Sequence, residues 1–177
     1  MSRTIFITGG ARSGKSGFAE KLATEFGAPL GYLATARTLD GEMDERVRRH
    51  RERRGSEWST IEEPLHLSQA LARCDGLYKV ILVDCVTLWL SNLLFEYEDA
   101  AGSCEERIHE DLQRLKSTLH EMATPVILVS NEVGMGIVPD NSLARMFRDI
   151  AGTANQALAE AADEAHVVIS GIPLRLK

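Results

Sequence analysis

Short apolar runs alternate with helical patterns along the whole chain. Five runs have the length and apolar content of strands, at residues 4–8, 30–35, 79–84, 125–130 and 166–170. Amphipathic stretches of helical period separate them, at residues 16–26, about 42–54, 65–73, 86–95, 104–122 and 140–164. This alternation predicts an α/β fold, with a mostly parallel central sheet and helices on both faces. The closing residues 172–177 can add a short antiparallel edge strand.

The length of the chain favours one domain. Its 177 residues are enough for one well-buried core, and no repeat or low-complexity linker divides them. We therefore expect a single domain over 1–177, in which residues 37–41 and 96–103 are loops. No apolar run approaches the ~20 residues that cross a bilayer. The sequence thus predicts a cytoplasmic protein without a membrane anchor.

Composition narrows the classes of partner. The net charge of −6 argues against a general nucleic-acid-binding surface. Cys74, Cys85 and Cys104 are odd in number and lack the spacing of metal ligands, so packing roles are expected for them.

A phosphate-binding motif directly follows the first predicted strand. It has the pattern GxxxxGK[ST] and consists of Gly9, Gly10, Ala11, Arg12, Ser13, Gly14, Lys15 and Ser16. In such a loop the backbone N–H groups turn inward around a polyphosphate, and the following helix adds a favourable dipole. Lys15 can reach the β- and γ-phosphates, and the Ser16 hydroxyl can hold Mg²⁺. The alternative is a glycine-rich turn without a ligand. Motif and context together favour a nucleoside triphosphate and a P-loop NTPase-like fold.

A second nucleotide signature is an aspartate at the end of an apolar run. Residues 80–83 are apolar and Asp84 follows them, at the carboxyl end of a predicted buried strand. There Asp84 can contact Mg²⁺ beside Ser16, although many strands end in aspartate for reasons of turn formation. The guanine-reading motif [NT]KxD of GTPase switches is absent, and no DxxG motif stands between the second and third predicted strands, where such switches carry it. Small-molecule kinase or transferase chemistry is therefore favoured over a switch.

Arginines are concentrated around one histidine, His50. They are Arg46, Arg48, Arg49, Arg51, Arg53 and Arg54. One interpretation is a solvated helix whose arginines pair with neighbouring acidic residues. The other is a phosphate site, because nearby cations keep an imidazole neutral and nucleophilic and also attract phosphates. An imidazole that attacks phosphorus gives a phosphoramidate. The residues alone leave both interpretations open.

Several longer segments carry a family resemblance. They are residues 8–16, 32–36, 44–51, Trp58 with 62–64, 84–94 and 130–139, followed by 147–152 and Asn155. The segment SNEVGMGIVP at 130–139 is the most distinctive of these. Through them the sequence closely resembles, nearly end to end, the bifunctional adenosylcobinamide kinase / adenosylcobinamide-phosphate guanylyltransferases of cobalamin biosynthesis, the CobU/CobP family.

The resemblance implies roles for individual residues. His50 corresponds to the histidine that becomes guanylylated, and the loop from Gly9 to Ser16, with Lys15, would hold the triphosphate. The positions that match contacts to guanine nucleotide are Ala34, Thr35, Ala36, Arg51, Glu52, Arg53, Arg54, Glu62 and Asp84. Members of the family are similar in being homotrimers, so a homotrimer is expected.

The implied chemistry has two steps. ATP or GTP phosphorylates a hydroxyl of adenosylcobinamide, with Lys15 and Mg²⁺ neutralising the phosphates. His50 then takes GMP from GTP and passes it to adenosylcobinamide phosphate, giving adenosylcobinamide-GDP. Two alternatives remain at this point: a kinase in which His50 has no covalent role, and a GTP-dependent regulatory binding module. For residues 131–139, a structural loop and a substrate-facing loop are both open.

Overall fold

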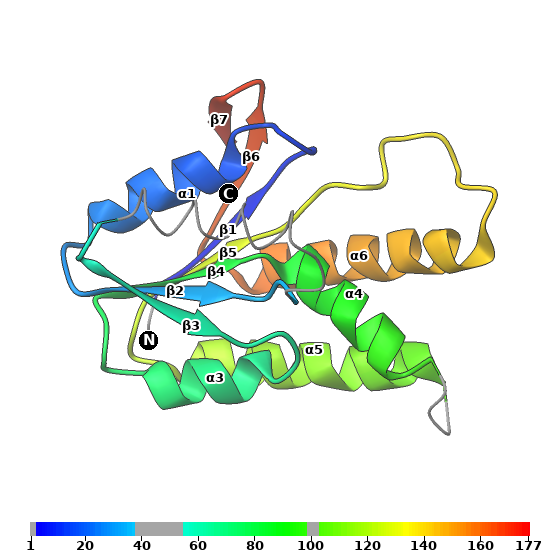
Figure 1. The fold of residues 1–177 in the computed structure, drawn as a ribbon. Coiled ribbons are helices and arrows are strands. Elements are labelled where there is room, and N and C mark those ends of the chain that lie inside the picture. Colours follow the sequence, from blue (N-terminus) through cyan, green and yellow to red (C-terminus); the bar gives the residue numbers. More distant parts are fainter. Residues whose placement is uncertain (1–2, 38–54, 99–102) are drawn as a thin grey trace.

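Seven strands form one sheet in the part of the chain that the computed structural model describes, residues 3–37, 55–98 and 103–177 (Figure 1). They are β1 (Thr4–Thr8), β2 (Leu30–Ala34), β3 (Trp58–Glu62), β4 (Val80–Asp84), β5 (Val126–Val129), β6 (Glu164–Ile169) and β7 (Ile172–Arg175). Their order across the sheet is β3-β2-β4-β5-β1-β6-β7. The first six pair in parallel, and β7 pairs antiparallel with β6. The predicted parallel sheet and its antiparallel edge strand are confirmed.

Helices cover both faces of the sheet, as predicted. The described helices are α1 (Lys15–Thr24), α3 (Leu67–Cys74), α4 (Val86–Glu96), α5 (Cys104–Glu121) and α6 (Ser142–Ala161). Figure 1 shows α1 on one face and the other four on the opposite face. The helix expected near 42–54 lies outside the described residues. None of the described helices has both the length and the apolar character needed to span a bilayer.

The helix predicted over 140–164 was too long at its C-terminal end. Ala162 has an extended backbone, and the helix ends at Ala161. The next residue is tied to the sheet, because the Asp163 carboxylate accepts a hydrogen bond of 2.7 Å from the Thr4 backbone N–H. β6 then begins at Glu164 and pairs with β1. Tertiary pairing therefore overrides the helical propensity of this alanine-rich stretch.

β3 is a strand that the sequence pattern did not predict. Its residues WSTIE include two hydroxyl side chains and a carboxylate, and each side chain is half-buried or exposed. In the described sheet β3 is an edge strand and pairs with β2. An edge strand needs no continuous apolar run, so the pattern typical of a buried parallel strand is missing here.

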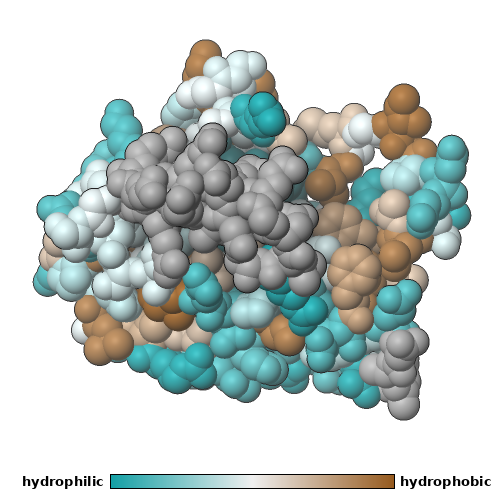
Figure 2. Space-filling model, viewed as in Figure 1, coloured by the Kyte–Doolittle hydropathy of each residue, from teal (hydrophilic) through white to brown (hydrophobic). Residues whose placement is uncertain are grey.

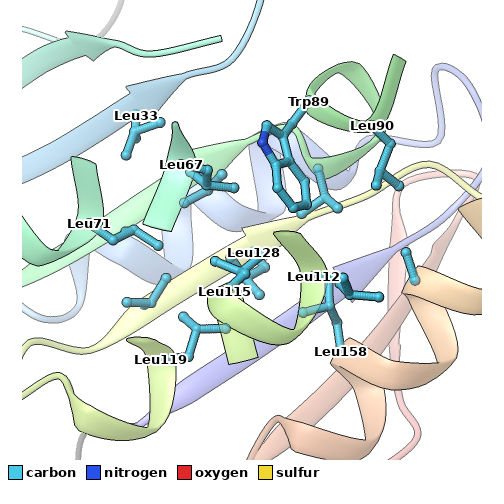
Figure 3. Close-up of a cluster of buried hydrophobic side chains, with 14 of the residues drawn as sticks. Leu33, Leu67, Leu71, Trp89, Leu90, Leu112, Leu115, Leu119, Leu128 and Leu158 are labelled. Atoms are coloured by element: carbon cyan, nitrogen blue, oxygen red, sulfur yellow. The ribbon is translucent and has the colours of Figure 1, made fainter. Parts of the chain in front are cut away.

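The larger hydrophobic core lies between the sheet and the four helices α3 to α6. Figure 3 shows leucines from the sheet and from these helices packed around Trp89, which is almost fully buried. The Trp89 indole N–H donates a hydrogen bond of 2.8 Å to the Leu65 carbonyl, so its one polar group is satisfied. This core fixes α4 and α6 against the sheet, and both helices contribute side chains to the site described below.

A smaller core lies beneath α1 on the opposite face. Ala19 and Ala23 pack with Ile5 and Ile7 of β1 and with Val129 of β5. All five side chains are completely buried. The small alanines let α1 approach the sheet closely, and this approach sets the position of the loop between β1 and α1.

Two connections are tied together at the amino-terminal edge of the sheet. The Asp75 carboxylate accepts hydrogen bonds from the backbone N–H groups of Thr124 (2.8 Å) and Ala123 (3.1 Å). The Thr124 hydroxyl accepts one from the Gly76 N–H at 2.7 Å. Hydrogen bonding from the Thr124 backbone is the main cause that lowers the pKa of Asp75, and burial opposes it. The charged carboxylate is thus the form that stabilises this edge.

We predict that Asp75→Asn lowers the free energy of unfolding at pH 7 by about 1 kcal/mol, at the low end for charged hydrogen bonds because the site lies near solvent. The folded-state pKa of Asp75 is depressed, so its contribution is present above the unfolded pKa of about 4 and is lost as the pH falls through the folded value. The free energies of unfolding of the wild type and Asp75→Asn should therefore converge as the pH falls. Urea unfolding of both proteins between pH 7 and pH 3 measures this. Glu57→Gln, which removes an exposed carboxylate, is the control; an equal loss in both variants would contradict the assignment.

Candidate nucleotide-binding site

The loop between β1 and α1 has a backbone that requires glycine at two positions. Gly9 has a φ of +155°, and a Cβ there would lie 2.5 Å from the Val168 carbonyl oxygen. Gly14 is the N-cap of α1 with a φ of +94°, in the left-handed region that glycine favours. The sequence motif is therefore matched by backbone geometry, with the loop running into the N-terminus of a helix, as a phosphate site requires.

Lys15 is buried within this loop. Lys15 is only 7% exposed, and its ammonium donates a hydrogen bond of 3.0 Å to the Gly10 carbonyl. The Ser13 N–H also donates to Gly10, at 3.2 Å. The ammonium is thus held at the loop, where its positive charge favours an anionic ligand.

Two buried hydroxyl groups of this region have no hydrogen-bond partner among the described residues. They are the Oγ1 of Thr8, the last residue of β1, and the Oγ of Ser13. Buried polar groups are normally satisfied, and unsatisfied ones mark a ligand or a solvent site. Phosphate oxygens would accept hydrogen bonds from both hydroxyls, so these groups fit a bound polyphosphate.

Three other predicted site residues lie side by side at the carboxyl edge of the sheet. The strand registers place Ala34 of β2 opposite Glu62 of β3 on one side and opposite Asp84 of β4 on the other. Asp84 is half-buried, and its carboxylate accepts a hydrogen bond of 3.0 Å from the Tyr32 hydroxyl. Glu62 is exposed at the end of its strand.

Thr35 fixes the backbone that follows two of these strands. It is completely buried, and its hydroxyl both accepts from the Cys85 N–H (2.9 Å) and donates to the Cys85 carbonyl (2.7 Å). Asn92 of α4 donates from its side-chain amide to the Thr35 carbonyl at 2.8 Å. Ala36, the next residue, is half-buried. Thr35 therefore acts on the site as a structural brace.

The Cys85 thiol stays protonated at neutral pH, so it is not an effective nucleophile. Burial is the main cause that raises the pKa of its thiol to about 11, and the charge of Asp84 raises it further. Only the thiolate is a strong nucleophile. The packing role expected for this cysteine is consistent with its protonated, buried state.

The predicted residues share one edge but do not form one cluster. β5 and β4 lie between β1 and β2, so the phosphate loop and the Ala34–Ala36 segment are separated by roughly 14 Å across the sheet. Ser16 is half-buried in the first turn of α1, beside the phosphate loop. His50, Arg51, Glu52, Arg53 and Arg54 lie outside the described residues, as does the rest of the arginine cluster.

A buried polar network lies beside the phosphate loop, and the sequence pattern does not predict it. The Ser130 hydroxyl donates to the Asn155 side-chain carbonyl at 2.6 Å and lies 3.1 Å from the Thr87 hydroxyl. Asn155 donates in turn to the Asn131 carbonyl (3.1 Å), and the Asn131 N–H donates to Thr87 (2.6 Å). The only signal in the sequence is the presence of polar residues within otherwise apolar segments. That these side chains hydrogen-bond to one another is visible only in the fold.

The fold is shared with other solved structures. A RadB recombinase superposes with a TM-score of 0.52 at 13% identity, over 93% of this chain and 73% of that chain. The flagellar accessory protein FlaH of Methanocaldococcus jannaschii superposes with a TM-score of 0.53 at 13% identity, over 99% of this chain and 78% of that one. At such identities the likeness concerns the fold alone.

Sequence comparison identifies much closer relatives. The bifunctional adenosylcobalamin biosynthesis protein CobU of Escherichia coli is 43% identical, over 98% of this chain and 99% of the relative. CobP of Pseudomonas aeruginosa, which bears the same description, is 43% identical over 97% and 95%. CobU of Salmonella typhimurium is 44% identical over 98% and 99%.

A family model gives the same result. The CobU model, described as cobinamide kinase / cobinamide phosphate guanyltransferase, matches residues 5–176. With a phosphate loop of the required geometry and relatives matched over nearly their whole length, the chain belongs to the CobU family of cobinamide kinases / cobinamide phosphate guanyltransferases.

Proposed function

We propose that this protein catalyses two successive transfers to a corrinoid in adenosylcobalamin biosynthesis. It phosphorylates adenosylcobinamide with ATP or GTP, and it then transfers GMP from GTP to the product to give adenosylcobinamide-GDP. The observation that carries the proposal is the phosphate loop, with its buried Lys15, in a chain whose relatives are named for both activities. Residues 1–177 act as one transferase domain in this proposal.

In the kinase step the phosphate loop holds the triphosphate. Backbone N–H groups between Gly9 and Ser16 bind its oxygens, with the Thr8 and Ser13 hydroxyls as further donors. The Lys15 ammonium stabilises the charge that develops on the transferring γ-phosphoryl group. A hydroxyl oxygen of adenosylcobinamide attacks the γ-phosphorus, the bond to the β,γ-bridging oxygen breaks, and the hydroxyl proton is released.

The Ser16 hydroxyl and the Asp84 carboxylate fit a magnesium ion. Both present oxygen, the ligand that Mg²⁺ prefers, and Asp84 is held by the Tyr32 hydroxyl at the carboxyl end of β4. A bound Mg²⁺ would neutralise charge on the β- and γ-phosphates. The Tyr32 hydrogen bond leaves Asp84 acceptor capacity for such an ion, since an ionised carboxylate has about four acceptor sites.

In the guanylyl step His50 is the nucleophile. Its neutral imidazole nitrogen attacks the α-phosphorus of GTP, the bond to pyrophosphate breaks, and a phosphoramidate to GMP forms. A phosphate oxygen of adenosylcobinamide phosphate then attacks the same phosphorus and releases the imidazole. Arg51, Arg53 and Arg54 provide positive charge for the phosphates, and Ala34–Ala36, Glu52 and Glu62 contribute to the binding of the guanine nucleotide. The resemblance to the family supports these roles.

The protein is a cytoplasmic homotrimer in this proposal, and the resemblance to the family supports the homotrimer. Light scattering on the purified protein would measure the mass of the assembly directly.

We predict that Lys15→Ala weakens triphosphate binding and lowers kinase kcat/KM together, by about 10- to 100-fold, because a charged hydrogen-bond donor to the phosphates is lost. Lys21→Ala is the matched control, since Lys21 is exposed in the last turn of the same helix. Titration with a fluorescent nucleotide and steady-state kinetics measure the two effects. Wild-type binding and turnover in Lys15→Ala would rule out the phosphate loop as the triphosphate site.

We predict that GTP labelled at its α-phosphate leaves an acid-labile label on the wild-type protein and none on His50→Ala. His120→Ala, which changes an exposed histidine in the last turn of α5, keeps the label. The kinase activity of His50→Ala, measured with labelled γ-phosphate, stays within about threefold of wild type, because His50 acts only on the α-phosphorus. Undiminished labelling of His50→Ala would remove the assignment of the nucleophile and leave a kinase.

A further inference from the structure

The loop between β5 and α6 carries three exposed apolar side chains at its tip. Met135 is 89% exposed, Ile137 is 97% exposed and Val138 is 58% exposed. We call these three residues the apolar tip. Figure 2 shows hydrophobic atoms at the outer bend of this loop, at the upper right of the view. Clustered aliphatic side chains in water mark a binding surface more often than isolated ones do.

The first part of the loop is fixed to the rest of the protein. The Asn131 backbone is held on both sides, by Thr87 of α4 (2.6 Å) and by Asn155 of α6 (3.1 Å). Val133 packs against the large core. The Glu132 side chain accepts a hydrogen bond of 2.7 Å from the Gly134 N–H, one residue before the apolar tip.

The far end of the loop is fixed as well. Arg145 of α6 donates from one guanidinium nitrogen to the carbonyls of Pro139 (2.9 Å) and Asp140 (2.7 Å). Asn141 caps the helix by accepting from the N–H groups of Leu143 and Ala144. Because both ends are held, the apolar tip is presented to solvent by a braced loop.

The same loop is continuous with the phosphate site. The Glu132 N–H donates a hydrogen bond of 3.0 Å to the carbonyl of Gly9, the first residue of the phosphate loop. Figure 1 shows both loops at the same end of the sheet. A broad ligand on the apolar tip therefore lies at the same end of the sheet as whatever the phosphate loop binds.

A second exposed apolar surface, Ile169 and Ile172, flanks the phosphate loop on its other side. The position of Asp84 distinguishes the two. In the proposed function its carboxylate would hold the Mg²⁺ that neutralises the β- and γ-phosphates, and Asp84 is the last residue of β4. β4 and β5 lie on the opposite side of β1 from β6 and β7. The terminal phosphates, and so the acceptor hydroxyl, belong on the side of the apolar tip.

We propose that the apolar tip is a docking surface for the corrin ring of the substrate, an inference that rests on the proposed function. A corrinoid is a broad macrocycle with apolar methyl groups and amide side chains, too large to enter the phosphate loop. Only its hydroxyl-bearing arm needs to reach the phosphates. Ligands of this kind are bound mainly by apolar contact with a few polar groups that fix orientation. Met135, Ile137 and Val138 supply that contact beside the site of transfer.

The test compares the double variant Met135→Ser/Ile137→Ser with wild type and with Leu77→Ser. Leu77 is a matched control, since it is 60% exposed but precedes β4 at the opposite edge of the sheet. We expect the Kd for adenosylcobinamide and its KM in the kinase reaction to rise about tenfold or more in the double variant. The nucleotide Kd and kcat of the double serine variant stay within about twofold of the wild-type values. The variant Met135→Leu/Ile137→Leu, which keeps apolar side chains, binds the corrinoid as the wild type does.

Three results would overturn the proposal. The first is an unchanged corrinoid Kd in the double serine variant. The second is a fall in the mass measured by light scattering, which would make the apolar tip a contact between copies of the chain. The third is a wild-type protein that binds nucleotide but no corrinoid, which would reject the proposed substrate and the docking surface with it.

Discussion

The site depends on the close approach of three backbone segments at Gly9. On one side lies the Val168 carbonyl at the end of β6, so close that a Cβ would meet it at 2.5 Å. On the other side the Gly9 carbonyl accepts the hydrogen bond from Glu132, where the loop to α6 begins. A side chain at residue 9 would meet the Val168 carbonyl and the Ser13 hydroxyl, so it would push the phosphate loop away from β6. The glycine therefore sets how closely the loop approaches β6, and its carbonyl ties the loop to the segment at Glu132.

The two cores serve the site differently. Beneath α1, alanines bring the helix N-terminus down onto β1, so the loop that precedes it closes tightly. On the other face, bulky leucines and Trp89 hold α4 and α6 at fixed positions, from which Thr87, Asn92 and Asn155 reach the strand ends. Because protein interiors are packed about as densely as organic crystals, these helices have little freedom to shift. The polar brace around residues 130 and 131 is thus placed by apolar packing.

The sequence predicts those features whose signal lies within one short stretch of the chain. The phosphate loop and the four-residue apolar runs were predictable, because their signals lie within a few consecutive residues. β3 was missed because an edge strand keeps polar side chains. The helix α6 was predicted too long because the residues that follow Ala161 lead into β6, which pairs with β1. The network of Thr87, Ser130, Asn131 and Asn155 joins three elements, so no stretch of sequence contains its pattern.

The turn between β6 and β7 touches the phosphate loop, because the Gly171 N–H donates a hydrogen bond of 2.8 Å to the Ser13 carbonyl. The loop precedes the turn by most of the length of the sequence, so it is synthesised well before the turn. A nascent chain therefore carries its phosphate motif long before the contact that completes it. The contact between the loop and the turn forms only after β6 has paired with β1, as expected for a fold whose contacts are widely separated along the chain.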